Sequence, residues 1–264
     1  MATLKLTIAY DGAEFSGWAW QPGLRTVQQT LEEAIEQILG ARQEVSLIVA
    51  GRTDAGVHAT AQVASFEVEG ETPKLFTKRI SAVLPRDLVV FECEPVPDGF
   101  DARRWATSRS YRYRLLASRH RAPFEEGRAL WWPRSLDRDA LDRCAGLIIG
   151  RHDFTAFTPT QTAHVHFHRV VSNSAWVEEE GGVLVYEITA DAFMRSMIRV
   201  LVGTMLEVAS GKRTLEDLEL LLQGAPRERA GETSPPHGLY FTGATFGDRP
   251  VFHPAEDDEA DELA

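Results

Sequence analysis

Residues 51–59 of this 264-residue chain read GRTDAGVHA, with one carboxylate, Asp54, placed between two glycines. Glycines let a backbone approach a ligand closely, because they carry no Cβ. Alternating apolar patterns at 45–49 and 62–68 predict strands on both sides, so the segment is expected to be a loop on a sheet. Taken alone, it has two interpretations: Asp54 is a turn residue that bonds its own backbone, or a carboxylate that the loop presents for chemistry.

Outward from this loop, the chain mixes strand and helix patterns. Alternation over Leu4, Leu6 and Ile8 predicts a first strand, and Thr26 with Gln29 fits a capping box that opens a helix ending before Gly40. Further strands are predicted at 110–116, 173–177, 183–190 and 239–246, and further helices at 137–149 and 193–209. Thr214 together with Asp217 is predicted to open another short helix.

Strands and long helices without regular alternation indicate an α+β fold. We expect two similar halves that share an extended mixed or antiparallel sheet flanked by helices, with a central active-site cleft. The predicted halves are 1–104, which carries the Asp54 loop, and 105–247. Residues 248–264 hold six acidic side chains in the last nine positions and are expected to be a disordered acidic tail.

The net charge of −11 argues against a nucleic-acid partner when it is taken as a global property, because phosphate binding needs Lys or Arg. The distribution reverses this locally. Residues 103–121 contain seven arginines and no Asp or Glu, with Trp105, Tyr111 and Tyr113 among them. Basic and aromatic residues together are typical of RNA-binding surfaces. A solvated strand face with ordinary arginine pairs is the alternative.

The compartment follows from what the sequence lacks. No secretory leader or membrane-spanning apolar run is recognisable. The two cysteines, Cys93 and Cys144, have no metal-ligand spacing and are expected to be reduced. No phosphate-cradling loop is present either. These features predict a cytoplasmic protein that needs neither cofactor nor metal.

The loop 51–59 resembles the signature of the TruA family of tRNA pseudouridine synthases. The resemblance covers nearly the whole chain except the acidic tail. It includes Tyr10-Asp11-Gly12, Phe15, Gly17-Trp18, Thr26-Val27-Gln28, Leu84-Pro85, Asp87, Phe100-Asp101-Ala102-Arg103, Tyr111-Arg112-Tyr113, His152-Asp153-Phe154, Phe157, Ala192-Phe193-Met194, Met197-Ile198-Arg199 and Gly238-Leu239-Tyr240. Two departures affect expected RNA contacts: Asp191 replaces a common Asn, and Trp20 replaces a basic residue.

The resemblance implies a role for each matching residue. Asp54 would be the nucleophile that breaks the uridine glycosidic bond, and Arg199 would be the cation that keeps it ionised and oriented. Tyr111 would stack on the flipped uracil, and its phenol could also relay the proton lost from carbon 5. Tyr113 better fits a tyrosine packed in the core. His58 better fits a structural hydrogen-bonding residue than a catalyst. Arg52 has two interpretations: it ties down its own loop, or it binds phosphate or holds open the gap left in the RNA beside Asp54, and we favour the second.

The partner that the resemblance implies is tRNA, at uridines 38, 39 and 40 of the anticodon stem-loop, bound by a homodimer. The arginines expected to contact RNA are Arg103, Arg109, Arg112, Arg119 and Arg195, the last on one helix face with Arg199.

Two other classes of function compete with this one. Strand alternation would place His164, His166 and His168 on one face, which suggests a zinc-dependent hydrolase. Metal ligands normally converge from several elements, however, and a straight row does not. A noncatalytic RNA-binding module is the second alternative, and the presence of Asp54, Arg199 and Tyr111 argues against it.

Overall fold

The computed structural model describes residues 1–40, 43–70, 74–162, 165–248 and 251. It divides into two compact units. The first combines Met1–Arg109 with Tyr240–Val251, and the second is Ser110–Leu239. The chain passes between the units within one strand and returns at the start of the last strand. In the described residues, no helix is long and apolar enough to cross a membrane.

The sheet of the first unit follows the order β4 (Leu88–Val96), β1 (Ala2–Tyr10), β3 (His58–Val68) and β10 (Leu239–Phe246). β1 is antiparallel to both β3 and β4, and the two-residue β2 (Ile48–Val49) adds to β3. β10 joins β3 in parallel, with Tyr240 opposite His58. β10, the last of the described strands, is therefore paired with the strand that follows the Asp54 loop.

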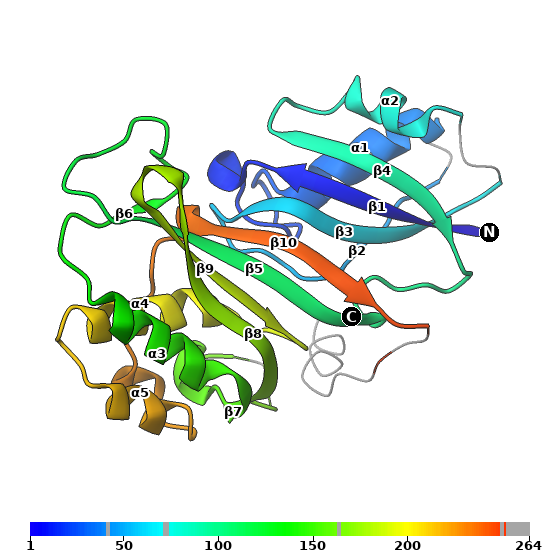
Figure 1. The fold of residues 1–264 in the computed structure, drawn as a ribbon. Helices are drawn as coiled ribbons and strands as arrows, with labels where there is room; N and C mark the ends of the chain where they lie inside the picture. Colours follow the sequence, from blue (N-terminus) through cyan, green and yellow to red (C-terminus); the bar gives the residue numbers. More distant parts are fainter. Residues whose placement is uncertain (41–42, 71–73, 163–164, 249–250, 252–264) are drawn as a thin grey trace. The chain divides into compact units, whose positions relative to one another are not determined.

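Two helices accompany this sheet (Figure 1). α1 (Val27–Leu39) begins as predicted, because the Thr26 side chain accepts the Gln29 N–H, and it ends at Gly40 with φ of 87°. Its apolar face buries Val27, Leu31, Ala34 and Ile35. The short α2 (Phe76–Ser81), which the sequence patterns did not predict, packs against β4.

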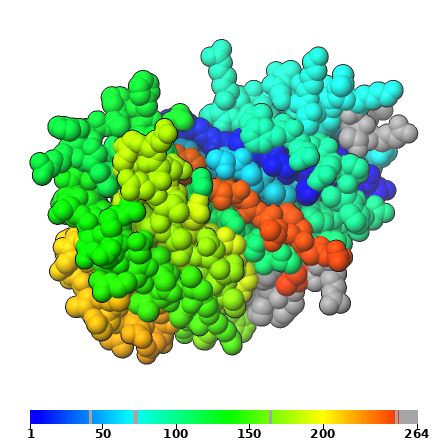
Figure 2. Space-filling view, viewed as in Figure 1, coloured from blue at the N-terminus to red at the C-terminus, as the bar shows by residue number. Residues whose placement is uncertain are grey.

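The second unit has its own strand order, β5 (Ala106–Leu116), β9 (Val183–Ala190), β8 (His168–Glu179) and β7 (Gly150–Asp153), with β6 (Leu130–Trp131) added to β5. Its helices are α3 (Arg138–Ile148), α4 (Met197–Ala209) and α5 (Leu215–Leu221), and α3 packs on both β8 and α4. The β8–β9 hairpin lies at the surface, yellow-green in Figure 2.

α4 is buried along almost its whole length, as its wide apolar face predicts. Its start differs from the predicted 193–209. Ser196 has φ of 59°, a left-handed conformation that cannot continue a right-handed helix, so the helix begins at Met197. The cap that Thr214 and Asp217 form at α5 is confirmed in both directions.

The α+β class is confirmed, but other boundaries differ from expectation. The strand predicted at 45–49 shortens to Ile48–Val49, whereas the strand predicted at 62–68 begins at His58. The boundary expected after residue 104 falls after Arg109, and β10 belongs to the first unit rather than the second. β10 belongs to the first unit because it pairs with β3. No local sequence pattern indicates that pairing. Of the expected acidic tail 248–264, only Asp248 and Val251 lie within the described residues.

Candidate active site

The loop that carries Asp54 is held from below by three buried side chains. The Tyr10 hydroxyl lies 2.8 Å from Thr53 Oγ1, and Gln62 Nε2 donates to the Gly51 carbonyl at 2.8 Å and to the Tyr10 hydroxyl at 3.4 Å. Burial raises the pKa of Tyr10 to about 12, so its phenol stays neutral and remains a hydrogen-bonding group. The backbone on the amino-terminal side of Asp54 is therefore fixed by a hydrogen-bonded network within the core.

The same loop is clamped by the segment that follows β1. The Trp18 N–H donates to the Thr53 carbonyl at 3.0 Å, and the Gly56 N–H donates to the Phe15 carbonyl at 3.3 Å. The approach is so close that only glycine fits: a Cβ on Gly17 would lie 2.8 Å from the Thr53 oxygen and 3.3 Å from the Asp54 carbonyl carbon. Asp54 is thus presented, half-buried, from a backbone held on two sides.

His58 occupies the structural role expected for it. Its ring is 3% exposed and stacks on Tyr240 with centroids 4.7 Å apart. Nδ1 accepts the Gly12 N–H at 3.0 Å, although Asp11 Oδ1 also lies 3.1 Å from it. Arg52, by contrast, is exposed on the loop.

In the second unit, Arg199 is fixed near the start of α4. Its Nε donates to the Ser234 carbonyl at 2.8 Å, and the Ser234 N–H returns a bond to the Arg199 carbonyl at 3.0 Å. The Tyr113 hydroxyl donates to the next carbonyl, that of Pro235, at 2.9 Å. The Ser234 carbonyl therefore orients the guanidinium, a role that the sequence patterns did not indicate.

Tyr111 is 7% exposed and meets Phe193 edge to face, with centroids 5.0 Å apart and planes at 76°. Tyr113, two residues on, is fully buried, and burial raises its pKa. Both tyrosines therefore lie on the buried face of β5, and strand alternation does not distinguish them. The hydroxyl of Tyr113 is bonded to backbone, which agrees with a core role. Phe193 was part of the matched motif, but no function had been assigned to it.

Arg109 is buried, whereas a contact with RNA phosphate requires an exposed guanidinium. It is 2% exposed, and its guanidinium donates to the carbonyls of Ala50 at 2.9 Å, Ala106 at 3.2 Å and Arg103 at 2.7 Å. Its burial contradicts the expected phosphate contact. The bond to Ala50, which directly precedes the Asp54 loop, gives Arg109 a structural role.

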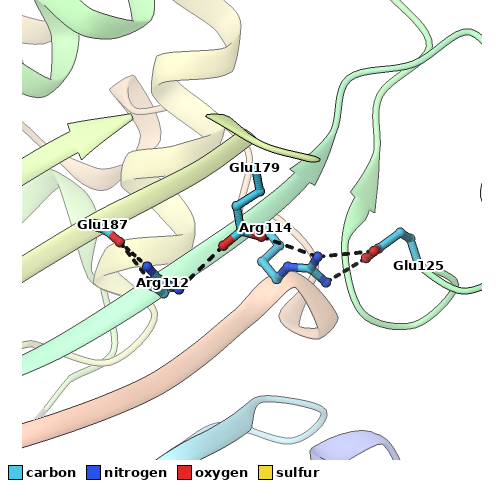
Figure 3. A network of polar contacts seen from close by, with 5 residues as sticks. All are labelled: Arg112, Arg114, Glu125, Glu179 and Glu187. Atoms are coloured by element: carbon cyan, nitrogen blue, oxygen red, sulfur yellow. Dashed lines mark hydrogen bonds and ion pairs between the residues drawn. The ribbon is translucent and has the colours of Figure 1, made fainter. Parts of the chain in front are cut away.

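Arg112 and Arg114 are neutralised by acidic residues distant in sequence (Figure 3). Arg112 bonds Glu187 at 2.5 and 2.9 Å and lies 3.5 Å from Glu179. Arg114 makes two bonds to Glu125, at 2.6 and 3.2 Å, and lies 3.6 Å from Glu179. The acidic partners come from β8, β9 and the connection before β6. Residues 103–121 contain no Asp or Glu, but acidic residues from other parts of the chain pair with these arginines. The net positive charge around this strand is therefore lower than the count within the segment predicts.

The other expected RNA contacts divide by exposure. Arg103 is half-buried, while Arg119 and Arg195 are exposed. Arg195 precedes α4, so it does not share a helix face with Arg199 as expected; the left-handed Ser196 separates them. In the predicted histidine row, β8 begins at His168, which leaves His166 outside the strand, and His164 lies outside the described residues.

The chain matches the model of a family described as tRNA pseudouridine synthase over residues 6–103 and 145–247. It is also similar to three bacterial proteins, each called tRNA pseudouridine synthase A. The first, from Myxococcus xanthus, is 37% identical over 95% of this chain and 94% of that protein. The second, from Porphyromonas gingivalis, is 38% identical over 91% and 96%. The third, from Bacillus subtilis, is 36% identical over 90% and 96%.

A solved structure, of a Cbf5–Nop10–Gar1 complex, is similar over 92% of this chain and 59% of the other, at 13% identity and a TM-score of 0.34. A score this low supports no conclusion about the site. The family match, in contrast, includes both the Asp54 loop and Arg199, whereas Tyr111 falls between its two matched ranges.

Proposed function

This chain belongs to the tRNA pseudouridine synthase A family, and we propose that it isomerises uridine to pseudouridine in the anticodon stem-loop of tRNA with Asp54 as the nucleophile. The reaction breaks the bond between ribose C1′ and uracil N1 and forms a bond between C1′ and C5, while the C5 proton is released and N1 gains one. Substrate and product have the same composition. The proposed reaction therefore consumes neither a redox nor a phosphate cofactor. We also expect no metal requirement.

The observation that carries the proposal is the clamped loop. A nucleophile must be held within a small distance of the atom that it attacks, since a displacement of about 1 Å can cost about 100-fold in rate. Asp54 follows Thr53, whose side chain and carbonyl are both bonded, and it precedes Gly56, whose N–H is bonded to Phe15. Such a preorganised carboxylate suits catalysis better than a solvated turn.

We assign Arg199 as the countercharge that favours the ionised form of Asp54, and Tyr111 as the surface on which the flipped uracil stacks. The two bonds between Arg199 and Ser234 support the first role, because a guanidinium held at Nε presents its remaining donors in a fixed direction. The contact between Tyr111 and Phe193 supports the second, because it fixes the tyrosine ring. Arg52 is exposed and suits a phosphate contact.

The finer assignments come from the family resemblance. We propose uridines 38, 39 and 40 as targets, a homodimer as the working form and the cytoplasm as the compartment. Arg119 and Arg195, which are exposed, are better placed for phosphate than Arg112, which is paired with glutamates.

The deciding experiment is tritium release from tRNA labelled at uridine C5. The Asp54→Asn variant nearly conserves shape but lacks a nucleophilic oxygen anion, so release should stop while tRNA binding persists. Asp139→Asn, an exposed carboxylate in the first turn of α3, is the matched control and should behave as wild type. Residual activity of Asp54→Asn within tenfold of wild type would contradict the assignment of Asp54.

A further inference from the structure

Trp20 is a large exposed aromatic on a fixed backbone. Its exposed fraction is 54%, whereas Trp18, two residues earlier, is 1% exposed and belongs to the core. The backbone N–H of Trp20 donates to Gln28 Oε1 at 3.2 Å. The backbone N–H of Ser16 donates to the Arg25 carbonyl at 2.8 Å, which joins the two ends of the segment 16–25. The backbone that carries Trp20 is thus fixed, and its exposed side chain is not part of the core.

The ends of this segment are fixed by further contacts. Arg25 pairs with Asp87 through two bonds, of 2.7 and 2.8 Å, and its guanidinium lies 4.0 Å from the centroid of the Phe15 ring. The pairing lowers the pKa of Asp87. A surface whose backbone is already ordered loses little conformational entropy when a ligand binds to it.

The segment lies beside the Asp54 loop within the same unit. The Trp18 N–H to Thr53 carbonyl bond joins the two directly. Trp20 follows Trp18, the donor of that bond, by two residues. The exposed Arg52 directly precedes Thr53, the acceptor. Two residues of chain span at most about 7 Å. Trp20 and Arg52 therefore both lie within a few residues of the bonded backbone that carries the proposed nucleophile.

We propose that Trp20 stacks on an unpaired nucleotide next to the target uridine, while Arg52 contacts its phosphate. The inference rests on the proposed function and extends it. When a uridine leaves the stack, its neighbours lose a stacking partner, and an aromatic side chain can replace it. The resemblance leads one to expect a basic residue at position 20. This chain would then use a stacking contact, which salt barely weakens, in place of a charged one.

Binding to tRNA is measured in the Asp54→Asn background, so that no turnover alters the RNA. Trp20→Ala should weaken affinity about 5- to 20-fold, because one stacked base is lost. Trp20→Phe should retain most of the affinity. Phe91→Ala removes another exposed aromatic from the same unit, 58% exposed on β4, and should change nothing.

Two further readouts separate stacking from charge and from structure. A base stacked on the indole should quench its fluorescence, and Trp20→Phe should lose that component while still binding. Trp20→Ala should leave the salt dependence of binding unchanged, whereas Arg52→Gln should lower its slope by about one unit.

Wild-type affinity and undiminished quenching in Trp20→Ala would overturn the proposal. So would a change in oligomeric state on substitution, because Trp20 would then face another protein chain. Equal losses in Trp20→Ala and Phe91→Ala would overturn it as well, since they would indicate general destabilisation. If the wild type released no tritium but binding and quenching still depended on Trp20, the proposed function would fail and the nucleotide contact would stand.

Discussion

The Asp54 loop and the arginine-rich segment 103–121 both attract attention in the sequence, yet the structure treats them differently. The backbone of the loop is fixed on both sides of Asp54, because Thr53 and Gly56 are bonded to Trp18 and Phe15 in the segment beside it. The segment does not keep its apparent charge: Arg109 is buried, and Arg112 and Arg114 face glutamates from other elements. A motif that specifies backbone geometry is therefore a safer guide to local structure than a count of charges is to an exposed charge.

The largest effect on the reaction rate should come from Tyr111, one of the aromatic residues of the arginine-rich segment. Tyr111→Ala removes the proposed stacking face, and the single-turnover rate should fall about 100- to 1000-fold, whereas Tyr111→Phe should keep most of it. Tyr186→Phe, which removes another buried tyrosine hydroxyl, one that is bonded to Ser174, is the matched control and should keep the wild-type rate. If Phe and Ala at position 111 are equally inactive, the hydroxyl is essential and Tyr111 is the proton relay at C5.

The next effect tests the clamp on the loop. Gly17→Ala would place a Cβ 2.8 Å from the Thr53 oxygen at φ of 96°, so the Asp54 backbone must shift and the single-turnover rate should fall about 100-fold. Gly23→Ala is the control, because its φ is also positive, at 72°, but nothing lies within 4 Å of its Cβ position. Equal rates in the two variants would show that the clamp does not position Asp54.

A stability measurement tests the buried arginine. Arg109→Met keeps the apolar stem but leaves the carbonyls of Ala50, Ala106 and Arg103 without that donor, so the free energy of unfolding in urea should fall by about 2 to 3 kcal/mol. Arg104→Met, at an exposed position, should change it by less than about 0.5 kcal/mol. An unchanged stability with a reduced salt slope for tRNA binding would restore Arg109 as an RNA contact.

The smallest expected effect is on tRNA binding, where an exposed arginine and one paired with glutamates should behave differently. Arg119→Gln should weaken tRNA binding a few-fold and lower its salt slope by about one unit, because one phosphate contact is lost. Arg112→Gln should leave the slope nearly unchanged, since Glu187 and Glu179 already neutralise that guanidinium. The reverse result would mean that RNA displaces these glutamates from Arg112.

Features that depend on neighbours in the chain were predictable. Helix α1 was bounded correctly, because Thr26 and Gly40 act on the turns next to them. The capping box at α5 was predicted for the same reason. The start of α4 was not, because apolar spacing continues through Phe193 and Met194 while the backbone turns at Ser196.

By itself, the sequence determined the α+β class, the loop that carries Asp54 and, through resemblance, the family. Only the tertiary structure decided that β10 pairs with β3, that Ser234 orients Arg199 and that Tyr10 and Gln62 support the loop. It also decided which arginines keep their charge exposed. These outcomes depend on atoms that are tens of residues apart in sequence, and a local pattern carries no information about the partner that a distant segment will supply.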